Sequence, residues 1–534
     1  MPITGFFALC WFLLRVIPKP SRAAYPCQRV AFPVASGFVL WLAGALGSIA
    51  AVRKARRCFA QTRYVLCAAL LAGAVGATWL VLGFAGSNTL LAELPAPNTP
   101  IGTARGLNPG RVVWVHEPDA TDWDGPGDGH WWQSEHTDQA VVDEMVDRAI
   151  RALAGKPTST GAWQSLFAHF NAEHGKGAVG YKPGEKIMIK VNFVGCIAIW
   201  SRRPATSSDD YNLRSPDYMN TAPQVINALL NQLVNRVGVR QSDITVGDPL
   251  GYFPNEYYRI CHGRFPDVRY LDYWGKFGRT AAKLSSVPLY WSTPAARGKK
   301  TDYLPVSYVQ ADYLINLANL KSHNDHAGIT LTAKNHYGSL LRRPRSTEYY
   351  DLHQDLPYTT PGNGHYRPLV DLVGHSQLGG KTLLYLIDGL YAGKHAKERA
   401  PRKWLSRPFN NDWTSSILAS QDPVAIDSVG FDLLRTEWDD APHKSGTNDY
   451  LIEAALAEDP PSGTFYDPDH PGNTARLKSL GVYEHWNNPA EKLYSRNLKT
   501  GLGIELVKLP KGSAARKVTA SAEGVGPVVA AVSD

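Results

Sequence analysis

Short apolar runs that alternate with helix-like segments constrain the fold of this chain more than any other feature of its sequence. The predicted strands are 112–116, 186–194, 243–247, 313–320, 382–387 and 416–419. The predicted helices are 137–154 with Thr137 as its cap, a segment that Thr221 caps and Gly238 follows, and 427–438. Runs such as IMIKV and LLYLI show little alternation, which is typical of strands covered on both faces. The pattern therefore predicts an α/β fold with a largely parallel sheet and helices on both faces.

The first 86 residues differ from the rest of the chain in charge. They contain nine of the 56 Lys and Arg residues and none of the 48 Asp and Glu residues. The formal net charge of +8 and the pI near 9.0 therefore come from this segment, while the remainder is almost neutral. Because the large domain has no excess of positive charge, we exclude nucleic acid as a partner.

Two apolar stretches in the same segment predict that the fold is preceded by two transmembrane helices, at 33–52 and 64–86. Each stretch is long enough to cross a hydrocarbon core of roughly 30 Å. Residues 1–86 are thus predicted to be a membrane segment, and the membrane is a predicted partner. Residues 1–30 either contact the membrane as well or come from a misassigned start.

The basic residues between the two stretches predict the orientation of the chain. Five of the residues in 53–63 are basic, which favours the cytoplasmic side for this segment. Arg56-Arg57 ahead of an apolar run also resembles a twin-arginine export signal. Both features predict a membrane-anchored protein with a periplasmic or other extracytoplasmic main domain. Four basic residues in 15–29 also favour the cytoplasm, so a cytoplasmic domain remains the alternative.

The rest of the chain is predicted to contain a linker at 87–110, a single α/β domain at 111–508 and a flexible tail at 509–534. Long polar segments at 201–220 and 341–368 are either lids over a site or simple insertions. Cys196 and Cys261 are the two cysteines of the domain, and they either form a disulfide or stay free. The sequence has no CxxC motif, which excludes an iron–sulfur cluster ligated by this chain.

Polar residues follow the predicted strands, and residues 311–338 are the richest example. There, an apolar run stops at Lys321-Ser322-His323, and a second basic cluster follows at Lys334-Asn335. Such groups are costly to bury between apolar segments unless an anion meets them. Ligands of open α/β sheets bind outside the carboxyl ends of the strands, so we expect the polar residues to converge on one crevice.

We assign three roles to these residues. The predicted catalytic residues are Lys321, His323, Lys334 and Asp388. The predicted ligand-binding residues are Lys190, Asn192 and Asn335. The predicted metal ligands, for a divalent cation such as Mg²⁺, are Asp248, Asp422 and Asp427. Each aspartate also has an ordinary alternative as a turn, cap or ion-pair residue.

Several of these motifs, in this order, resemble the family known as domain of unknown function 362. The resemblance covers residues 186–436 and depends on Lys321-x-His323, Lys334-Asn335 with Gly338, and Asp422-Pro-Val-Ala-x-Asp427. It implies an α/β domain with one shared polar site, and it supplies no reaction. Some members of the family carry ferredoxin-type cysteines, so the resemblance also implies an association with redox chemistry. This chain lacks those cysteines.

Three functions remain open from the sequence. The first is an enzyme or binding protein for a small anionic or phosphorylated ligand, because lysine, histidine and acid together suit proton or group transfer. The second is a redox accessory protein that works with a separate iron–sulfur or quinone partner. The third is a non-catalytic module that binds the cell envelope through Trp114, Trp123, Trp131 and Trp132, although these residues are expected to pack under a loop.

Overall fold

The computed structural model describes residues 96–198, 205–293, 301–323, 327–341, 350–395 and 398–511, together with residues 49–59 and isolated positions near the amino terminus. The chain forms two compact units, Met1–Glu93 and Leu94–Asp534. Most residues of the predicted spans 33–52 and 64–86 lie outside the described residues. Within the described part of the chain, no helix combines the length and the apolar character that a bilayer crossing needs.

The larger unit is built on a mixed sheet of ten described strands. Their bounds are β2 (Arg111–His116), β3 (Ile187–Lys190), β4 (Ile244–Gly247), β5 (Arg269–Asp272), β6 (Thr280–Ala281), β9 (Tyr313–Ser322), β10 (Ile329–Thr330), β11 (Thr382–Gly393), β12 (Ser416–Ser420) and β14 (Glu505–Leu509). The strand order is β14-β2-β12-β11-β9-β3-β4-β5-β6, and β10 pairs with β9. All neighbours are parallel except at β12, which is antiparallel to β11 and β2, and at β10.

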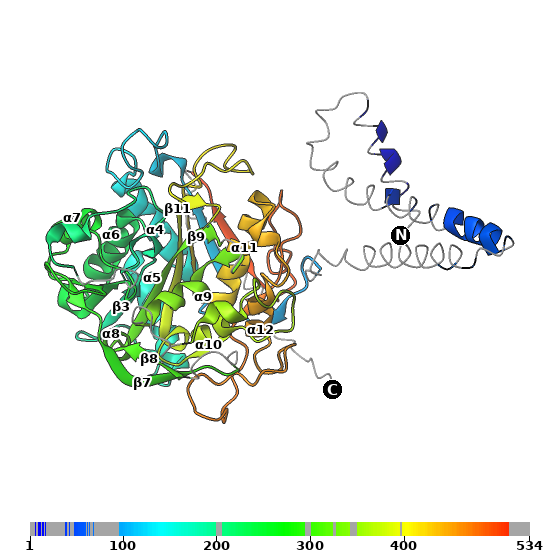
Figure 1. Cartoon of the computed structure of the whole chain (residues 1–534). Coiled ribbons are helices and arrows are strands. Elements are labelled where there is room, and N and C mark those ends of the chain that lie inside the picture. The colour runs from blue at the N-terminus through cyan, green and yellow to red at the C-terminus, as the bar shows by residue number, and fades with distance from the viewer. Residues whose placement is uncertain are drawn as a thin grey trace, which may run out of the picture. The chain divides into compact units, whose positions relative to one another are not determined.

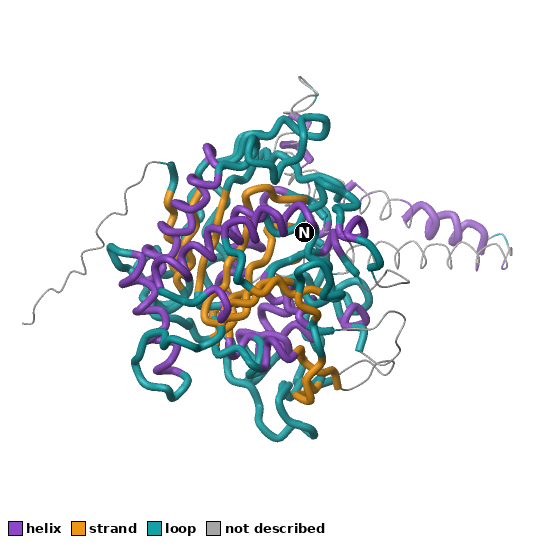
Figure 2. Tube along the Cα trace, turned by 90° about the vertical axis from the view of Figure 1, so that its left-hand side faces the viewer, coloured by secondary structure: helices purple, strands orange, loops and turns teal. Residues whose placement is uncertain are grey.

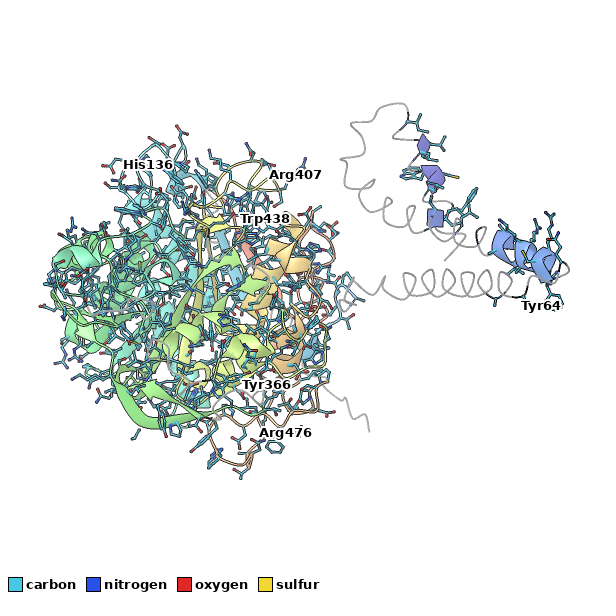
Figure 3. All side chains as sticks on the ribbon, viewed as in Figure 1. Tyr64, His136, Tyr366, Arg407, Trp438 and Arg476 are labelled. Atoms are coloured by element: carbon cyan, nitrogen blue, oxygen red, sulfur yellow. The ribbon has the colours of Figure 1, made fainter. Side chains whose placement is uncertain are left out.

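Helices cover both faces of this sheet (Figures 1 and 2). One layer contains α4 (Gln139–Ala154), α5 (Ser159–Glu173), α6 (Pro223–Gln232) and α7 (Asn255–Arg264). The other contains α8 (Val306–Val309), α9 (Thr332–Asn335), α10 (Pro368–Gly374), α11 (Pro423–Glu437) and α12 (Asp449–Ala455). Side chains fill both layers (Figure 3). The predicted α/β fold with a mostly parallel sheet is confirmed.

Strand β3 shows how the two layers share one sheet. Ile187 and Ile189 are buried in the cluster under α4–α7, whereas Met188 is buried in the cluster on the opposite face. Successive side chains of a strand point to opposite faces, so an unbroken apolar run is what a doubly covered strand requires. Two small antiparallel pairs flank the main sheet: β1 (Ile101–Gly102) with β13 (Val482–Tyr483), and β7 (Leu284–Tyr290) with β8 (Thr301–Pro305).

The helix starts differ from those predicted. Asp138, not Thr137, caps α4 by accepting hydrogen bonds from the backbone N–H groups of Ala140 and Val141. Thr221 does not cap α6, because its hydroxyl accepts from the Asn192 backbone N–H instead. Helix α11 begins at Pro423, four residues before the predicted start, and Asp422 is its cap. Gly155 follows α4 as predicted, and Gly238 follows the π-helical turn Leu233–Val237 that continues α6; both glycines have the left-handed conformation.

The two cysteines of the domain do not form a disulfide. Both Cys196 and Cys261 are free thiols and are fully buried. Burial raises the pKa of each thiol, because the thiolate would lose its hydration. These side chains therefore behave as small apolar core residues rather than as reactive groups.

Candidate functional site at the carboxyl edge of the sheet

A cavity of about 320 Å³ lies where β3, β4 and β9 end. Six of the ten predicted site residues line it: Lys190, Asn192, Asp248, His323, Lys334 and Asn335. They come from the ends of three parallel strands and from α9, which follows the β9–β10 pair. The carboxyl ends of parallel strands meet at one edge of a sheet, so residues distant in sequence converge here as predicted.

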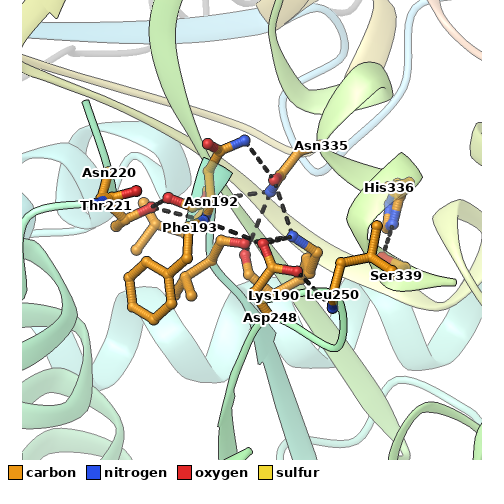
Figure 4. Close-up of polar contacts among 12 residues, drawn as sticks. Lys190, Asn192, Phe193, Asn220, Thr221, Asp248, Leu250, Asn335, His336 and Ser339 are labelled. Carbon is orange, nitrogen blue, oxygen red and sulfur yellow. Dashed lines mark hydrogen bonds and ion pairs between the residues drawn. The ribbon is translucent and has the colours of Figure 1, made fainter. Parts of the chain in front are cut away.

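The floor of the cavity contains a buried ion pair (Figure 4). The Lys190 ammonium lies 3.1 Å from the Asp248 carboxylate and also donates to the Asn335 side-chain oxygen at 3.1 Å and to the Val191 carbonyl. An ammonium has three N–H donors, so these contacts occupy all of them. Burial lowers the pKa of Lys190, and the carboxylate of Asp248 partly offsets this effect.

Backbone groups hold the Asp248 carboxylate in place. It accepts hydrogen bonds from the backbone N–H groups of Phe193 and Leu250, each at 3.1 Å. These residues lie just past the ends of β3 and β4, so the ion pair joins the two strands where their backbone pairing stops. The pair is thus a structural part of the cavity floor.

Two asparagines extend this network. The Asn335 side-chain oxygen accepts from both Lys190 and the Asn192 amide, the latter at 3.1 Å (Figure 4). The Asn335 amide donates to Asn316 at 2.8 Å. The Asn192 oxygen in turn accepts from the Lys321 ammonium at 3.0 Å. The direction of each hydrogen bond fixes the orientation of both amides. Asn192 and Asn335 therefore present defined faces to the cavity.

Lys321 and Asp388, both predicted to be catalytic, do not line the cavity. Lys321 is fully buried, and its ammonium donates to Asn192 and, at 2.8 Å, to the Met219 carbonyl. Asp388 is also buried and accepts from the backbone N–H groups of Ala222 and Leu390. Burial lowers the pKa of Lys321 to about 7 and raises that of Asp388 to about 6. Lys321 supports the cavity through Asn192, whereas Asp388 holds the backbone at Ala222 and Leu390.

Three further polar residues, His323, Thr330 and Lys334, line the cavity. The Lys334 ammonium lies 4.2 Å from the centre of the Tyr337 ring, a cation–π distance. His323 is 6.3 Å from the ring of His353, measured between ring centres. The Thr330 hydroxyl is buried and has no hydrogen-bond partner among the described residues. A buried hydroxyl without a partner is costly, so a ligand polar atom would stabilise it.

Residues 351–359 complete the cavity and were not assigned as site residues from the sequence. Asp351, His353, Gln354, Tyr358 and Thr359 all line it. His353 Nδ1 lies 2.8 Å from the Asp351 carboxylate, and this contact holds the pKa of Asp351 well below its usual range. They lie within the long polar segment 341–368, for which a lid was one of two predictions. Loop length was the only signal, because no spacing in the segment indicates a site.

Gly338 leaves room for the ion pair. A methyl group at this position would lie 2.8 Å from the Lys190 ammonium and 3.0 Å from a carboxylate oxygen of Asp248. Both distances are shorter than ordinary contacts, and neither partner can move without breaking hydrogen bonds. The glycine of the Lys334–Gly338 motif therefore has a steric role at the cavity floor.

The expectation that Asp422 joins this site is wrong. Strand β12 is antiparallel to its neighbours, so its carboxyl end lies at the opposite edge of the sheet. There, Asp422 accepts from the backbone N–H groups of Arg105, Val424, Ala425 and Val482. The carboxylate holds the start of α11 to two distant segments, and burial raises its pKa to about 6.

Asp427 also has a structural environment. Its carboxylate accepts from the Thr332 backbone N–H and hydroxyl, the Ala333 backbone N–H and the Tyr450 hydroxyl. It thereby joins α11, α9 and α12. The three predicted metal ligands do not converge, and no group of three His, Cys, Asp or Glu side chains is arranged to hold a metal ion in the described part of the chain.

The tryptophans near the amino end of the domain pack inside it. Trp123, Trp131 and Trp132 are buried, and Trp123 stacks on Trp413 with ring centres 5.5 Å apart. Trp114 is buried on the other side of the sheet and donates to the Ser416 hydroxyl. The expected packing role is confirmed, and these rings do not form an exposed platform for sugars.

Comparisons with known proteins give one match, to a protein family. No curated protein and no solved structure matches the chain. Residues 210–432 match the family described as Domain of unknown function (DUF362). The match lies within the region of resemblance predicted from the motifs and extends from before β4 into α11, so it contains Asp248, His323, Lys334 and Asn335. The chain therefore contains a DUF362 domain at residues 210–432.

Proposed function

We propose that the domain binds a small organic anion, a carboxylate or phosphate, in the cavity at the carboxyl edge of the sheet. The observation that carries this proposal is that Lys334, His323 and Thr330, whose buried hydroxyl has no hydrogen-bond partner among the described residues, all line that cavity. A lysine ammonium and an imidazole are common donors to carboxylate and phosphate oxygens. The partly enclosed cavity weakens solvent screening, which strengthens such contacts.

The lining also favours an apolar part in the ligand. Val194, Ile197, Leu250 and Tyr358 contribute apolar walls to the same cavity. A typical ligand site combines such walls with a few polar groups that fix orientation. We therefore expect an anionic head and a planar or aliphatic body rather than a bare inorganic ion.

Lys190 has a different part in this proposal. Its three donors already serve Asp248, Asn335 and Val191, so it holds the floor of the cavity in place and does not donate directly to the ligand. His323 and His353 are the imidazoles among the described lining residues, and imidazole suits proton transfer; His353 already contacts the Asp351 carboxylate. We infer that the ligand is a substrate for proton or group transfer and that His323 acts as the acid or base.

We expect a divalent cation to bind in the cavity only when the ligand supplies some of its oxygen ligands. Asp248 and Asp351 are the carboxylates among the described lining residues, and both already bind protein donors. Mg²⁺ commonly uses one or two carboxylates plus ligand oxygens. We expect Mg²⁺ to tighten the binding of a phosphate ligand and EDTA to reverse that effect, as measured by calorimetric titration.

The test of the anion site uses calorimetric titration of the full chain with phenyl phosphate, benzoate, inorganic phosphate and acetate. We expect the aromatic anions to bind more tightly than the small ones. Lys334→Met should weaken binding roughly tenfold or more, since it removes a charge-assisted hydrogen bond. Lys182→Met is the matched control, because Lys182 is exposed and does not line the cavity. Equal affinities for the two variants would refute the proposal.

Anchoring of the domain outside the cytoplasm is a proposal from the sequence alone. It depends on the two apolar stretches and the basic segment between them. Cell fractionation of the full chain, compared with a chain that starts at Leu94, tests it. We expect the full chain in the membrane fraction and sensitive to protease added from outside the inner membrane. Recovery of the full chain with the soluble proteins would contradict it.

A further inference from the structure

A second cavity lies at the opposite, amino edge of the sheet. Its volume is about 190 Å³, and it lies between the starts of β3 and β5 and the short helix α8. Three cationic residues line it: Lys186, Arg269 and Lys283. No carboxylate is among the described lining residues. The first cavity differs, because its lining contains two carboxylates: Asp248, paired with Lys190, and Asp351, which contacts His353.

The strand register explains why these cations share one space. Thr245 of β4 pairs with Arg269 of β5 on one side and with Met188 of β3 on the other. Met188 is buried in the cluster on the α8 face, so Thr245 and Arg269 lie on that face too. Lys186 precedes Met188 by two residues and therefore has the same orientation.

Lys283 reaches the cavity from another element. Its carbonyl accepts a hydrogen bond from the Val306 backbone N–H at 2.8 Å, which fixes the segment before β7 against the start of α8. Ser307 of α8 lines the cavity, and its buried hydroxyl has no hydrogen-bond partner among the described residues. The hydroxyl of Thr245 adds a second short donor.

The three cations are not neutralised by nearby acids. Within the described part of the chain, no Asp or Glu carboxylate forms an ion pair within 4.0 Å with Lys186, Arg269 or Lys283. The Asp312 carboxylate accepts a hydrogen bond from the backbone N–H of Lys186, not from its ammonium. A concave surface with one sign of charge concentrates its electric field and attracts counter-ions.

We propose that this amino-edge cavity is a second anion site, specific for a small, multiply charged anion of the phosphate class. Its volume suits inorganic phosphate or pyrophosphate, and its donors are ammonium, guanidinium and hydroxyl groups. Arg269 can bind two oxygens of such an anion at once. The site lies at the edge opposite the first cavity, so its ligand acts as an effector or a stabilising ion rather than as the substrate.

The experiment is a calorimetric titration of the full chain with inorganic pyrophosphate at low ionic strength. We expect saturable binding that weakens at least tenfold in the Lys186→Met/Arg269→Met double variant and weakens further as salt is added. Lys182→Met is the control for surface charge, because Lys182 is exposed and lies outside the cavity. It should bind as the wild type does.

The other outcomes separate this site from the first cavity. Lys334→Met should leave pyrophosphate binding at the amino edge unchanged, even where it abolishes the binding of aromatic anions. If Lys334→Met removes pyrophosphate binding and the double variant keeps it, the second site does not exist and the proposed function stands. Equal weakening by the double variant and by Lys182→Met would show non-specific attraction and would also overturn the inference.

Discussion

The buried ammonium of Lys321 should make the stability of the protein depend on pH in a specific way. Its pKa is about 7 in the folded protein, against an ordinary value of 10.5. Between these values the unfolded chain holds a proton that the folded protein has released. Stability therefore rises with pH in this range, by up to about 1.4 kcal/mol per pH unit. From pH 7 to pH 9 the free energy of unfolding rises by about 2 kcal/mol. The rise is less than the maximum slope gives, because Lys321 is already half deprotonated in the folded protein at pH 7.

Lys321→Met removes this dependence. The variant also loses the hydrogen bonds to Asn192 and Met219, but that loss shifts the free energy of unfolding equally at every pH. The measurement is urea unfolding of the full chain at pH 7, 8 and 9, followed by tryptophan fluorescence. We expect the wild type to gain about 2 kcal/mol more than Lys321→Met over this range. Lys182→Met, which removes an exposed lysine, should keep the wild-type slope.

Asp388 should produce the opposite slope at lower pH. Its pKa is raised to about 6 from an ordinary value of 3.8, so the folded protein holds a proton that the unfolded chain releases between these values. Stability then falls as pH rises from about 4 to about 6. Together the two residues contribute least to the free energy of unfolding between about pH 6 and pH 7.

Identical slopes of unfolding free energy against pH for the wild type and Lys321→Met from pH 7 to 9 would refute the reasoning about Lys321. A buried ammonium with a lowered pKa cannot titrate without making stability depend on pH.

Three further changes test individual structural conclusions. Gly338→Ala should cost about 1–3 kcal/mol in urea unfolding, because the added methyl lies 2.8 Å from the Lys190 ammonium; a loss below about 0.5 kcal/mol would contradict the close packing. Asp422→Asn should cost roughly 2 kcal/mol or more, because a carboxylate that accepts four backbone N–H bonds becomes an amide, yet anion affinity at the first cavity should not change. Cys196 and Cys261 should resist alkylation in the native protein and react only after unfolding, as read by mass-spectrometric mapping, and modification of either thiol in the native protein would show that it is not buried.

The residues that could be predicted for the site share a simple origin. Lys190, Asp248 and His323 each lie at or just past the end of a strand, and β3, β4 and β9 are parallel. A periodic apolar pattern is enough to locate such strands, and parallel pairing then brings their ends together. The same logic could not locate Asp351 and His353, because they lie on a loop whose path depends on tertiary packing.

The sequence did not show how deeply Asp388 and Lys321 are buried in the sheet. Asp388 ends an apolar run in the sequence, but β11 continues past it to Gly393. Lys321 likewise lies inside β9, where it pairs with Gly393. A charged residue in an apolar run suggests a strand end, and only the neighbouring strand shows that the backbone pairing continues. Both residues are therefore buried beside the cavity instead of lining it.

Strand direction decided which acids reach the site. The connection from Gly393 to Ser416 is long enough for a parallel crossover, yet the described part of it contains no helix. Parallel crossovers usually contain one. β12 instead returns antiparallel, with Ser416 opposite Gly389. This reversal places the end of β12 at the edge of the sheet opposite the cavity. Asp422 therefore caps α11 at that edge, while Asp248 pairs with Lys190 at the carboxyl edge. A sequence pattern of period two carries no sign of direction, and the length of the connection permits both.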